Sequence, residues 1–274
     1  MTEANFSGAK ILLVNDDGID APGLQALRQA LEGCCDLLVV APMSERSGAG
    51  CSLSLNLAMP VQKRYRPDGS IWGWSVDGTP ADCVKFAMTA LGDYRPDLVL
   101  SGINRGRNVG NSVFYSGTVA GATEATFFGL RALASSLSVS AEKSEKHFDA
   151  AARMVVRLIP WLLEQDWPPR HFWNLNVPNR ALDEIKGLRF THQGTSFFVD
   201  DFVLEREEGD LLYYKNVGKH LEKSTEPADS DDIILDAGAA SLSLLNLDMT
   251  VAVPDAARRA LEENWNRIVF GAAG

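Results

Sequence analysis

The sequence is poor in the residues that mark secreted, membrane-spanning or zinc-binding proteins. It contains only four cysteines and four histidines in 274 residues. None of the cysteines forms a CxxC pair, and the adjacent Cys34 and Cys35 are poorly placed to bridge each other, so we expect a reducing, cytoplasmic setting. No apolar run approaches the roughly 20 residues that cross a bilayer. The first ten residues also lack the apolar stretch of a signal peptide.

Basic residues are scarce as well. There are 26 lysines and arginines against 36 aspartates and glutamates, which gives a formal net charge of −10. Binding to a nucleic-acid polymer depends on clustered basic side chains, so we do not expect such a partner, nor a membrane. A small phosphate ester held through a metal ion remains compatible with this charge. The 46% of hydrophobic residues is enough for one large core, with or without an appendage.

Strand and helix signals alternate along the first part of the chain. We expect buried strands at 10–15, 36–42, 96–104, 130–139 and 171–178, and a hairpin at 59–76. We expect helices at 21–33, 79–91, 116–129 and 144–165, with a break allowed at Pro160. This alternation predicts an α/β fold with a doubly wound, mostly parallel sheet.

The second part of the chain does not continue this alternation of strand and helix signals. We place an α/β core at residues 1–186, and at 187–274 an extended part that is not an independent domain. Within it we expect a projecting hairpin with strands at 196–207 and 210–217, then an exposed loop at 219–232. A returning strand at 239–251 and a C-terminal helix at 255–268 complete the chain.

Three polar loops follow predicted strands, at Asn15–Asp17, Ala41–Gly50 and Gly102–Gly110. In a parallel sheet these loops meet at one edge, where ligands bind. Asp16 and Asp17 are adjacent, and two carboxylates at ~4 Å repel by about 1 kcal/mol in water and about 4 kcal/mol near a protein surface. A cation between them, or a proton on one, removes this repulsion. The alternative is a helix cap with a solvated neighbour.

The other two loops supply neutral ligands. Ser47 offers a hydroxyl, although a plain polar turn also accounts for its segment. Asn104 and Asn108 offer amide groups in a glycine-rich stretch, for which a flexible loop is the alternative reading. The run Ser116-Gly117-Thr118 then opens a helix, whose free N–H groups favour a phosphate. Such oxygen ligands suit Mg²⁺ or Mn²⁺ rather than zinc.

These motifs together resemble the SurE family of metal-dependent 5′(3′)-nucleotidases. The resemblance lies in ILLVNDDGIDAPGLQAL, VVAPMSERSGAGCSLSL, GTPADCVKFA, PDLVLSGINRGRNVG and YSGTVAGATEA, in order over residues 10–130, with NLNVP at 174–178. It implies hydrolysis of nucleoside 5′- and 3′-monophosphates with one divalent metal ion per subunit, Mg²⁺ or Mn²⁺. It also implies a homodimer or homotetramer, assembled through the hairpin arm and the C-terminal helix. The tail departs from the family pattern in ADSDDIILDAG and in DAGAASLSLLNLDMTV.

The resemblance also implies roles for individual residues. The metal ligands that it implies are Asp16, Asp17, Ser47 and Asn104. We expect Asp16, Asp17 and Asn104 to act in catalysis, with Asp17 as the general base. The residues expected to contact the phosphate are Asn15, Gly48, Asn108, Ser116, Gly117 and Thr118.

Two rival functions use similar residues. A covalent aspartyl phosphatase usually spaces its aspartates as DxD, whereas Asp16 and Asp17 are adjacent. A phospho-receiver module needs a phosphorylatable aspartate at the end of its third strand, where this chain has Asn104.

Overall fold

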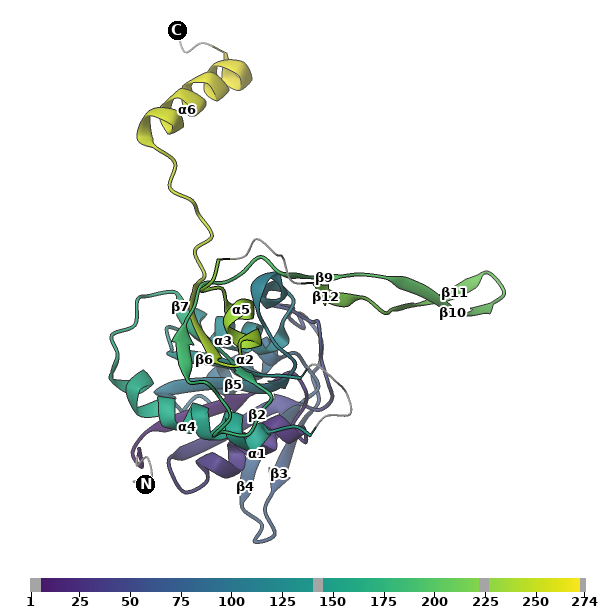
Figure 1. Ribbon diagram of the computed structural model, residues 1–274, viewed down its shortest axis with the longest axis vertical. Coiled ribbons are helices and arrows are strands. Elements are labelled where there is room, and N and C mark those ends of the chain that lie inside the picture. The colour runs from purple at the N-terminus through teal and green to yellow at the C-terminus, as the bar shows by residue number, and fades with distance from the viewer. Residues whose placement is uncertain (1–5, 140–144, 222–226, 272–274) are drawn as a thin grey trace.

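A nine-stranded mixed sheet forms the centre of the computed structural model, which describes residues 6–139, 145–221 and 227–271 (Figure 1). Its strands are β1 (Lys10–Val14), β2 (Asp36–Pro42), β3 (Val61–Tyr65), β4 (Ile71–Val76), β5 (Leu98–Arg105), β6 (Ala132–Ser138), β7 (His171–Pro178), β8 (Leu188–Phe190) and β13 (Ala240–Asn246). Their order is β3-β4-β2-β1-β5-β6-β7-β13-β8, with β3 antiparallel to β4 and β13 antiparallel to β7. The other neighbouring strands are parallel, which confirms the predicted α/β class.

Helices cover both faces of this sheet. On one face α1 (Pro22–Leu31) packs beside α4 (Phe148–Glu164), and on the other α2 (Pro80–Thr89) packs beside α3 (Gly117–Phe127). Successive residues of β1 therefore enter different cores. Ile11 and Leu13 join the cluster that contains α1 and α4, while Leu12 and Val14 join the cluster that contains α2 and α3. Burial on both faces explains why this strand is continuously apolar.

The break allowed at Pro160 does not occur. Helix α4 runs without interruption from Phe148 to Glu164, with Pro160 inside it. A proline within a helix removes one hydrogen bond and crowds the preceding turn. The apolar face of α4, which buries Val155, Ile159 and Leu162 in the core, outweighs this cost.

The prediction of an exposed loop at 219–232 is confirmed at 227–229, which are exposed, but was wrong at 219–221, which form a strand, and at 230–232, which are buried. Residues Lys219–Leu221 form β12, and α5 begins at Asp231 and ends at Asp236. The Asp231 carboxylate is fully buried and accepts backbone N–H groups from Gly110 at 3.1 Å and Gly194 at 2.9 Å. These N–H donors, which lie far away in the sequence, offset the cost of burying the Asp231 carboxylate. Residues 222–226 of the predicted loop lie outside the described part of the chain.

Two segments project from the body of the molecule (Figure 1). The antiparallel pair β10 (Phe202–Glu208) and β11 (Leu211–Asn216) forms the predicted hairpin, and pairing of β9 (Phe197–Val199) with β12 lengthens it towards the body. We call residues 197–221 the arm. After β13 the chain runs extended to α6 (Asp255–Phe270), which stands away from the sheet.

The division into a core at 1–186 and an extended part at 187–274 stays a prediction. Strands β8 and β13 from the second part lie in the main sheet, so this part is joined to the core by strand pairing. Within the described ranges, no helix is both long enough and apolar enough to cross a membrane.

Candidate functional site

The polar residues that follow β1 and β5 lie at a topological switch point of the sheet. These two strands are parallel neighbours, but β1 leads into α1 on one face and β5 leads, through a short 3₁₀ turn at Gly110–Phe114, into α3 on the other. Connections that leave in opposite directions open a crevice beyond the carboxyl ends of the strands. Asp16 and Asp17 follow β1 at this crevice, and Asn104 lies near the end of β5.

Asp16 points towards the start of α3. Its side chain is 4% exposed, and the hydroxyl of Thr118 donates a hydrogen bond to its Oδ1. Burial raises the pKa of Asp16 to about 6; the Thr118 hydroxyl opposes this shift and the charge of Asp17 adds to it. The site therefore holds a carboxyl group that lacks full compensation for its negative charge.

Asp17 points towards the end of β5. Its Oδ2 accepts the backbone N–H of Arg105 at 2.9 Å. Burial raises the pKa of Asp17, the Arg105 amide lowers it, and the charge of Glu45 raises it further. The two adjacent aspartates are thus held by different elements, as the alternation of side chains along a strand requires.

Ser47 and Asn104 reach the same region from the two neighbouring loops. The backbone N–H of Arg46 donates to the carbonyl oxygen of Asp16 at 2.8 Å, which ties the loop of Ser47 to the end of β1. The Asn104 Nδ2 donates to the Gly106 carbonyl at 2.9 Å, so the amide oxygen is the atom that remains for a cation. The Arg46 bond to Asp16 and the Arg105 bond to Asp17 bring the backbones of the three loops together, while the role of Ser47 and Asn104 as ligands stays a prediction.

The donor set fits a hard divalent cation. Within the described ranges, no three His, Cys, Asp or Glu side chains gather in a cation-binding arrangement. The ligands expected from the sequence, which are two carboxylates, the hydroxyl of Ser47 and the amide oxygen of Asn104, stay a prediction. Oxygen ligands of this mixed kind suit Mg²⁺ or Mn²⁺.

Glu45 is a neighbour of the site that the sequence reasoning missed. Its Oε1 accepts a hydrogen bond from the Ser47 hydroxyl at 2.6 Å, and its charge raises the pKa of Asp17. Its position two residues before Ser47, in a loop that follows a buried strand, was the available signal. Glu45 adds negative charge beside the acidic pair, which strengthens the need for a cation.

The start of α3 packs directly on Asp16. Ser116 caps the helix, because its hydroxyl oxygen accepts the Val119 N–H at 3.1 Å. A Cβ atom at Gly117 would lie 2.7 Å from the Cβ of Asp16, so only glycine allows this approach. The hydroxyl and backbone amide of Thr118 both bond to the Asp16 carboxyl group. The positive end of α3 is therefore directed at the site.

Gly48 and Asn15, which are also expected at the phosphate, have different surroundings. Gly48 has a positive φ of 71° in the loop of Ser47, with open space on its Cβ side. Asn15 is fully buried and its Nδ2 donates to the Gly18 carbonyl at 2.8 Å, which shapes the turn after β1. Their contact with phosphate stays a prediction.

Asn108 lies in a buried polar network on the β6 and β7 side. Its backbone N–H donates to Asn176 Oδ1 at 2.8 Å, and its Nδ2 donates to Ser136 Oγ at 2.9 Å. Asn174 Nδ2 donates in turn to the Asn108 carbonyl at 2.8 Å. None of these contacts reaches the acidic pair, so Asn108 fixes the loop after β5, and its expected role at the phosphate stays a prediction.

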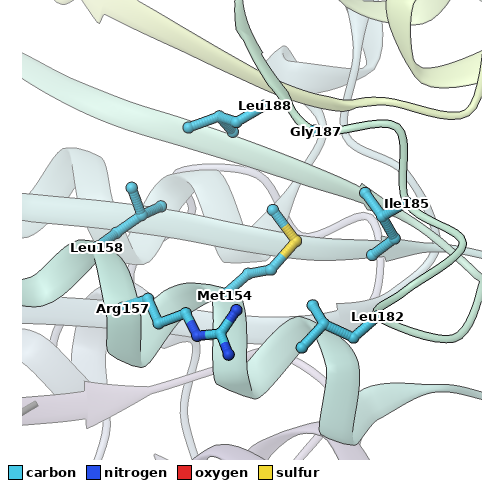
Figure 2. A pocket seen from close by; sticks show the side chains of 7 residues that line it. All are labelled: Met154, Arg157, Leu158, Leu182, Ile185, Gly187 and Leu188. Carbon is cyan, nitrogen blue, oxygen red and sulfur yellow. The ribbon is translucent and has the colours of Figure 1, made fainter. Parts of the chain in front are cut away.

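A cavity of about 300 Å³ between α4 and residues 182–188 has the wrong chemistry for this site. Figure 2 shows Met154, Leu182 and Ile185 pointing into it, with the guanidinium of Arg157 beside them. None of the predicted site residues lines it. The switch point beyond β1 and β5 is therefore the candidate active site.

We predict that Asp16→Asn stabilises the protein after removal of metal ions by a chelator. The folded pKa of Asp16, about 6, exceeds the ordinary 3.8, so its contribution to stability is full below 3.8 and is lost as the pH rises through 6. The melting temperature of the variant should therefore exceed that of the wild type in mildly alkaline buffer, and the gap should close on acidification. Asn keeps an oxygen for the Thr118 hydroxyl. Asp93→Asn, at an exposed aspartate, is the control and should change little. A lower melting temperature for Asp16→Asn would contradict the inference that the Asp16 charge destabilises the metal-free protein.

Comparison with known proteins identifies one family. The family described as Survival protein SurE matches residues 11–200. The 5′-nucleotidase SurE of Carboxydothermus hydrogenoformans is 41% identical over 243 residues, which cover 88% of this chain and 91% of that protein. The 5′/3′-nucleotidase SurE of Proteus mirabilis is 40% identical over 242 residues, with the same coverage.

A solved structure shares the whole architecture. The crystal structure of the SurE protein from Aquifex aeolicus matches with a TM-score of 0.73 and 31% sequence identity, covering 94% of this chain and 99% of that one. The match in sequence and the match in structure extend over most of the chain. The chain therefore belongs to the SurE family.

Proposed function

We propose that the chain is a phosphomonoesterase that hydrolyses nucleoside 5′-monophosphates, and 3′-monophosphates, to nucleoside and phosphate. Relatives named as 5′-nucleotidase and 5′/3′-nucleotidase support this activity at about 40% identity over most of the chain. The observation that carries it is the carboxylate pair at the switch point, with Asp16 buried and Asp17 partly buried, faced by the N-terminus of α3. Together they offer a place for a cation and an anion side by side.

The residues that would hold the cation are Asp16, Asp17, Ser47 and Asn104, and the cation would be one Mg²⁺ or Mn²⁺ per subunit. When bound, it would polarise the phosphoryl group and lower the pKa of an attacking water molecule. Asn104 contributes an oxygen without adding charge, which suits a site that must also accept an anionic ester. Thr118 keeps the Asp16 carboxyl group in place through its hydroxyl.

Asp17 is the best general base. It is more exposed than Asp16, and the Arg105 amide holds one of its oxygens. It would take the proton from the attacking water. Backbone N–H groups at Gly48 and at the Ser116–Thr118 helix start would stabilise the negative charge that develops on the phosphoryl oxygens.

The two rival functions are less well supported by the site. Asp16 and Asp17 point to different elements, which differs from the DxD arrangement of an aspartyl phosphatase. The strand next to β1, β5, carries Asn104 near its end rather than an aspartate, so the phosphorylated group of a receiver module is missing there.

We predict that Asp17→Asn lowers phosphate release from a nucleoside monophosphate by about a hundredfold or more, because loss of a general base costs factors of that order. Chelation should abolish the wild-type activity, and Mn²⁺ or Mg²⁺ should restore it. Asp93→Asn should retain wild-type activity. Full activity in Asp17→Asn, or activity that survives chelation, would overturn the assignment. A stable phosphoprotein on Asp16 or Asp17 would instead indicate the aspartyl mechanism.

We also infer that the chain forms a homodimer or homotetramer. The arm exposes apolar side chains that a lone two-stranded ribbon does not bury, and such a ribbon is marginal in water. Among them Phe202 is 62% exposed and Leu211 is 56% exposed. Helix α6 likewise exposes Leu261, Trp265 and Ile268, at helical spacing. Exposed apolar surface of this extent usually marks an interface, and a second copy of the chain would cover it.

Replacing Phe202–Asn216 with a two-residue Asn-Gly turn should lower the molar mass measured by light scattering. The ribbon would still close at the β9 and β12 pair, so the body should keep its fold. The substitutions Phe202→Ser and Leu211→Ser should weaken assembly, while Glu207→Ser on the same ribbon should not. An intact protein that sediments as a monomer at micromolar concentration would refute the inference.

The setting inside the cell is a further inference. Cys34, Cys35, Cys51 and Cys83 all carry free thiols, which supports a reducing cytoplasm. The acidic balance of the chain supports a small-molecule substrate over a nucleic-acid polymer.

A further inference from the structure

A second pocket opens at the same edge of the sheet as the acidic pair. Its volume is about 240 Å³, and its lining includes Arg46, which follows β2, and Asp77, which follows β4. Strands β4, β2 and β1 are consecutive and parallel in the sheet. Because neighbouring strands lie about 4.8 Å apart, the end of β4 is about 10 Å from the end of β1. That separation is comparable with the length of a nucleoside monophosphate.

One loop joins the pocket to the acidic pair. The backbone N–H of Arg46 is bonded to the carbonyl of Asp16, whereas the side chain of Arg46 reaches the other way and forms an ion pair with Asp77. Ser47, a candidate cation ligand, is the next residue. A ligand that lies along this loop can therefore touch the acidic pair at one end and the pocket at the other.

The walls of the pocket are held by hydrogen bonds. Asp82 Oδ2 accepts the backbone N–H of Thr79 at 2.9 Å and the hydroxyl of Ser54 at 2.8 Å. The backbone N–H of Asp77 donates to the Pro60 carbonyl at 2.9 Å. These bonds fasten residues 54–60 to the start of α2. The pocket is thus formed before any ligand arrives, as most small-molecule sites are.

The lining combines an apolar wall with a charged edge. Leu57, Ala58 and Met59 supply the apolar side. At the charged edge Asp77 is about half exposed, and the Nε–H of Arg46 is buried without a hydrogen-bond partner. An unsatisfied buried donor is costly. The Arg46 side chain as a whole is 37% exposed, so its outer N–H groups can donate to an acceptor on a ligand. A flat ring with polar groups on its rim matches this combination.

We propose that this pocket binds the base of the nucleotide whose phosphate occupies the acidic site, and that it favours guanine. The inference rests on the proposed nucleotidase function. Guanine presents a carbonyl acceptor beside two N–H donors, which complement an arginine donor beside a carboxylate acceptor. Asp77 would accept from the ring and amino N–H groups, and Arg46 would donate to the carbonyl. Leu57 and Met59 would pack on the face of the ring.

The test compares GMP and UMP with ribose 5-phosphate and phenyl phosphate, which lack a base. Asp77→Asn should raise the KM for GMP by about tenfold, the scale of a lost hydrogen bond to a charged group, without changing kcat. Leu57→Ser should raise the KM for GMP as well. Both variants should keep wild-type kinetics on the two base-free esters. Leu55→Ser is the matched control, because Leu55 and Leu57 are both 70% exposed but only Leu57 lines the pocket.

The outcomes separate this inference from the function on which it rests. Failure of the wild type to release phosphate from any of the four esters would refute the nucleotidase proposal. If the wild type is active, an equal change on GMP and on the base-free esters, or no change on either, overturns the base pocket and leaves the nucleotidase intact. An equal effect of Leu55→Ser and Leu57→Ser also overturns it. A wild-type preference for UMP over GMP would refute the choice of guanine.

Discussion

The electrostatic repulsion between Asp16 and Asp17 is the constraint on which the rest of the site depends. Both carboxyl groups are largely withdrawn from water, and burial raises the pKa of each. Glu45 brings a third negative charge to the same place. The N-terminus of helix α3 and the Thr118 hydroxyl compensate part of this negative charge. A divalent cation would compensate the rest, and it could then also bind an anionic phosphate ester.

The fold can hold this pair because β1 is buried on both faces. The strand cannot shift without exposing Ile11 and Leu13 on one side or Leu12 and Val14 on the other. The aspartates at its end are therefore fixed in direction, Asp16 towards the start of α3 and Asp17 towards the end of β5. The neighbouring strand β5 then brings Asn104 to the same edge, since β1 and β5 pair in register. The rigid core holds the two aspartates close together. In a flexible loop, their mutual repulsion would separate them.

Much of this arrangement was predictable, because local patterns determine it. Apolar runs identified the central strands, and the carboxyl ends of parallel strands must share an edge, so the meeting of the loops after β1, β2 and β5 followed. Features that depend on distant partners were not predictable. Asp231 looks exposed in sequence, yet the N–H groups of Gly110 and Gly194 allow its burial.

The same reason accounts for the other differences. Pro160 suggests a helix break, but the packing of α4 on the sheet overrides the local cost. The hydrogen bonds of Asn108 to Ser136 and Asn176 join it to strands that lie far along the chain, while its role at the phosphate stays a prediction. Glu45 shows its influence only once the loop after β2 is placed beside Asp17. In each case the contact that decides the outcome joins residues well separated in sequence.

The central claim is that one divalent cation neutralises the acidic pair, and its position is the most direct test. Crystals grown with Mn²⁺ can be measured near the manganese absorption edge to obtain an anomalous difference map. The account predicts one strong peak per subunit, ligated by Asp16, Asp17, Ser47 and Asn104. A map with no peak at these residues, or with a peak ligated by other side chains, would contradict it.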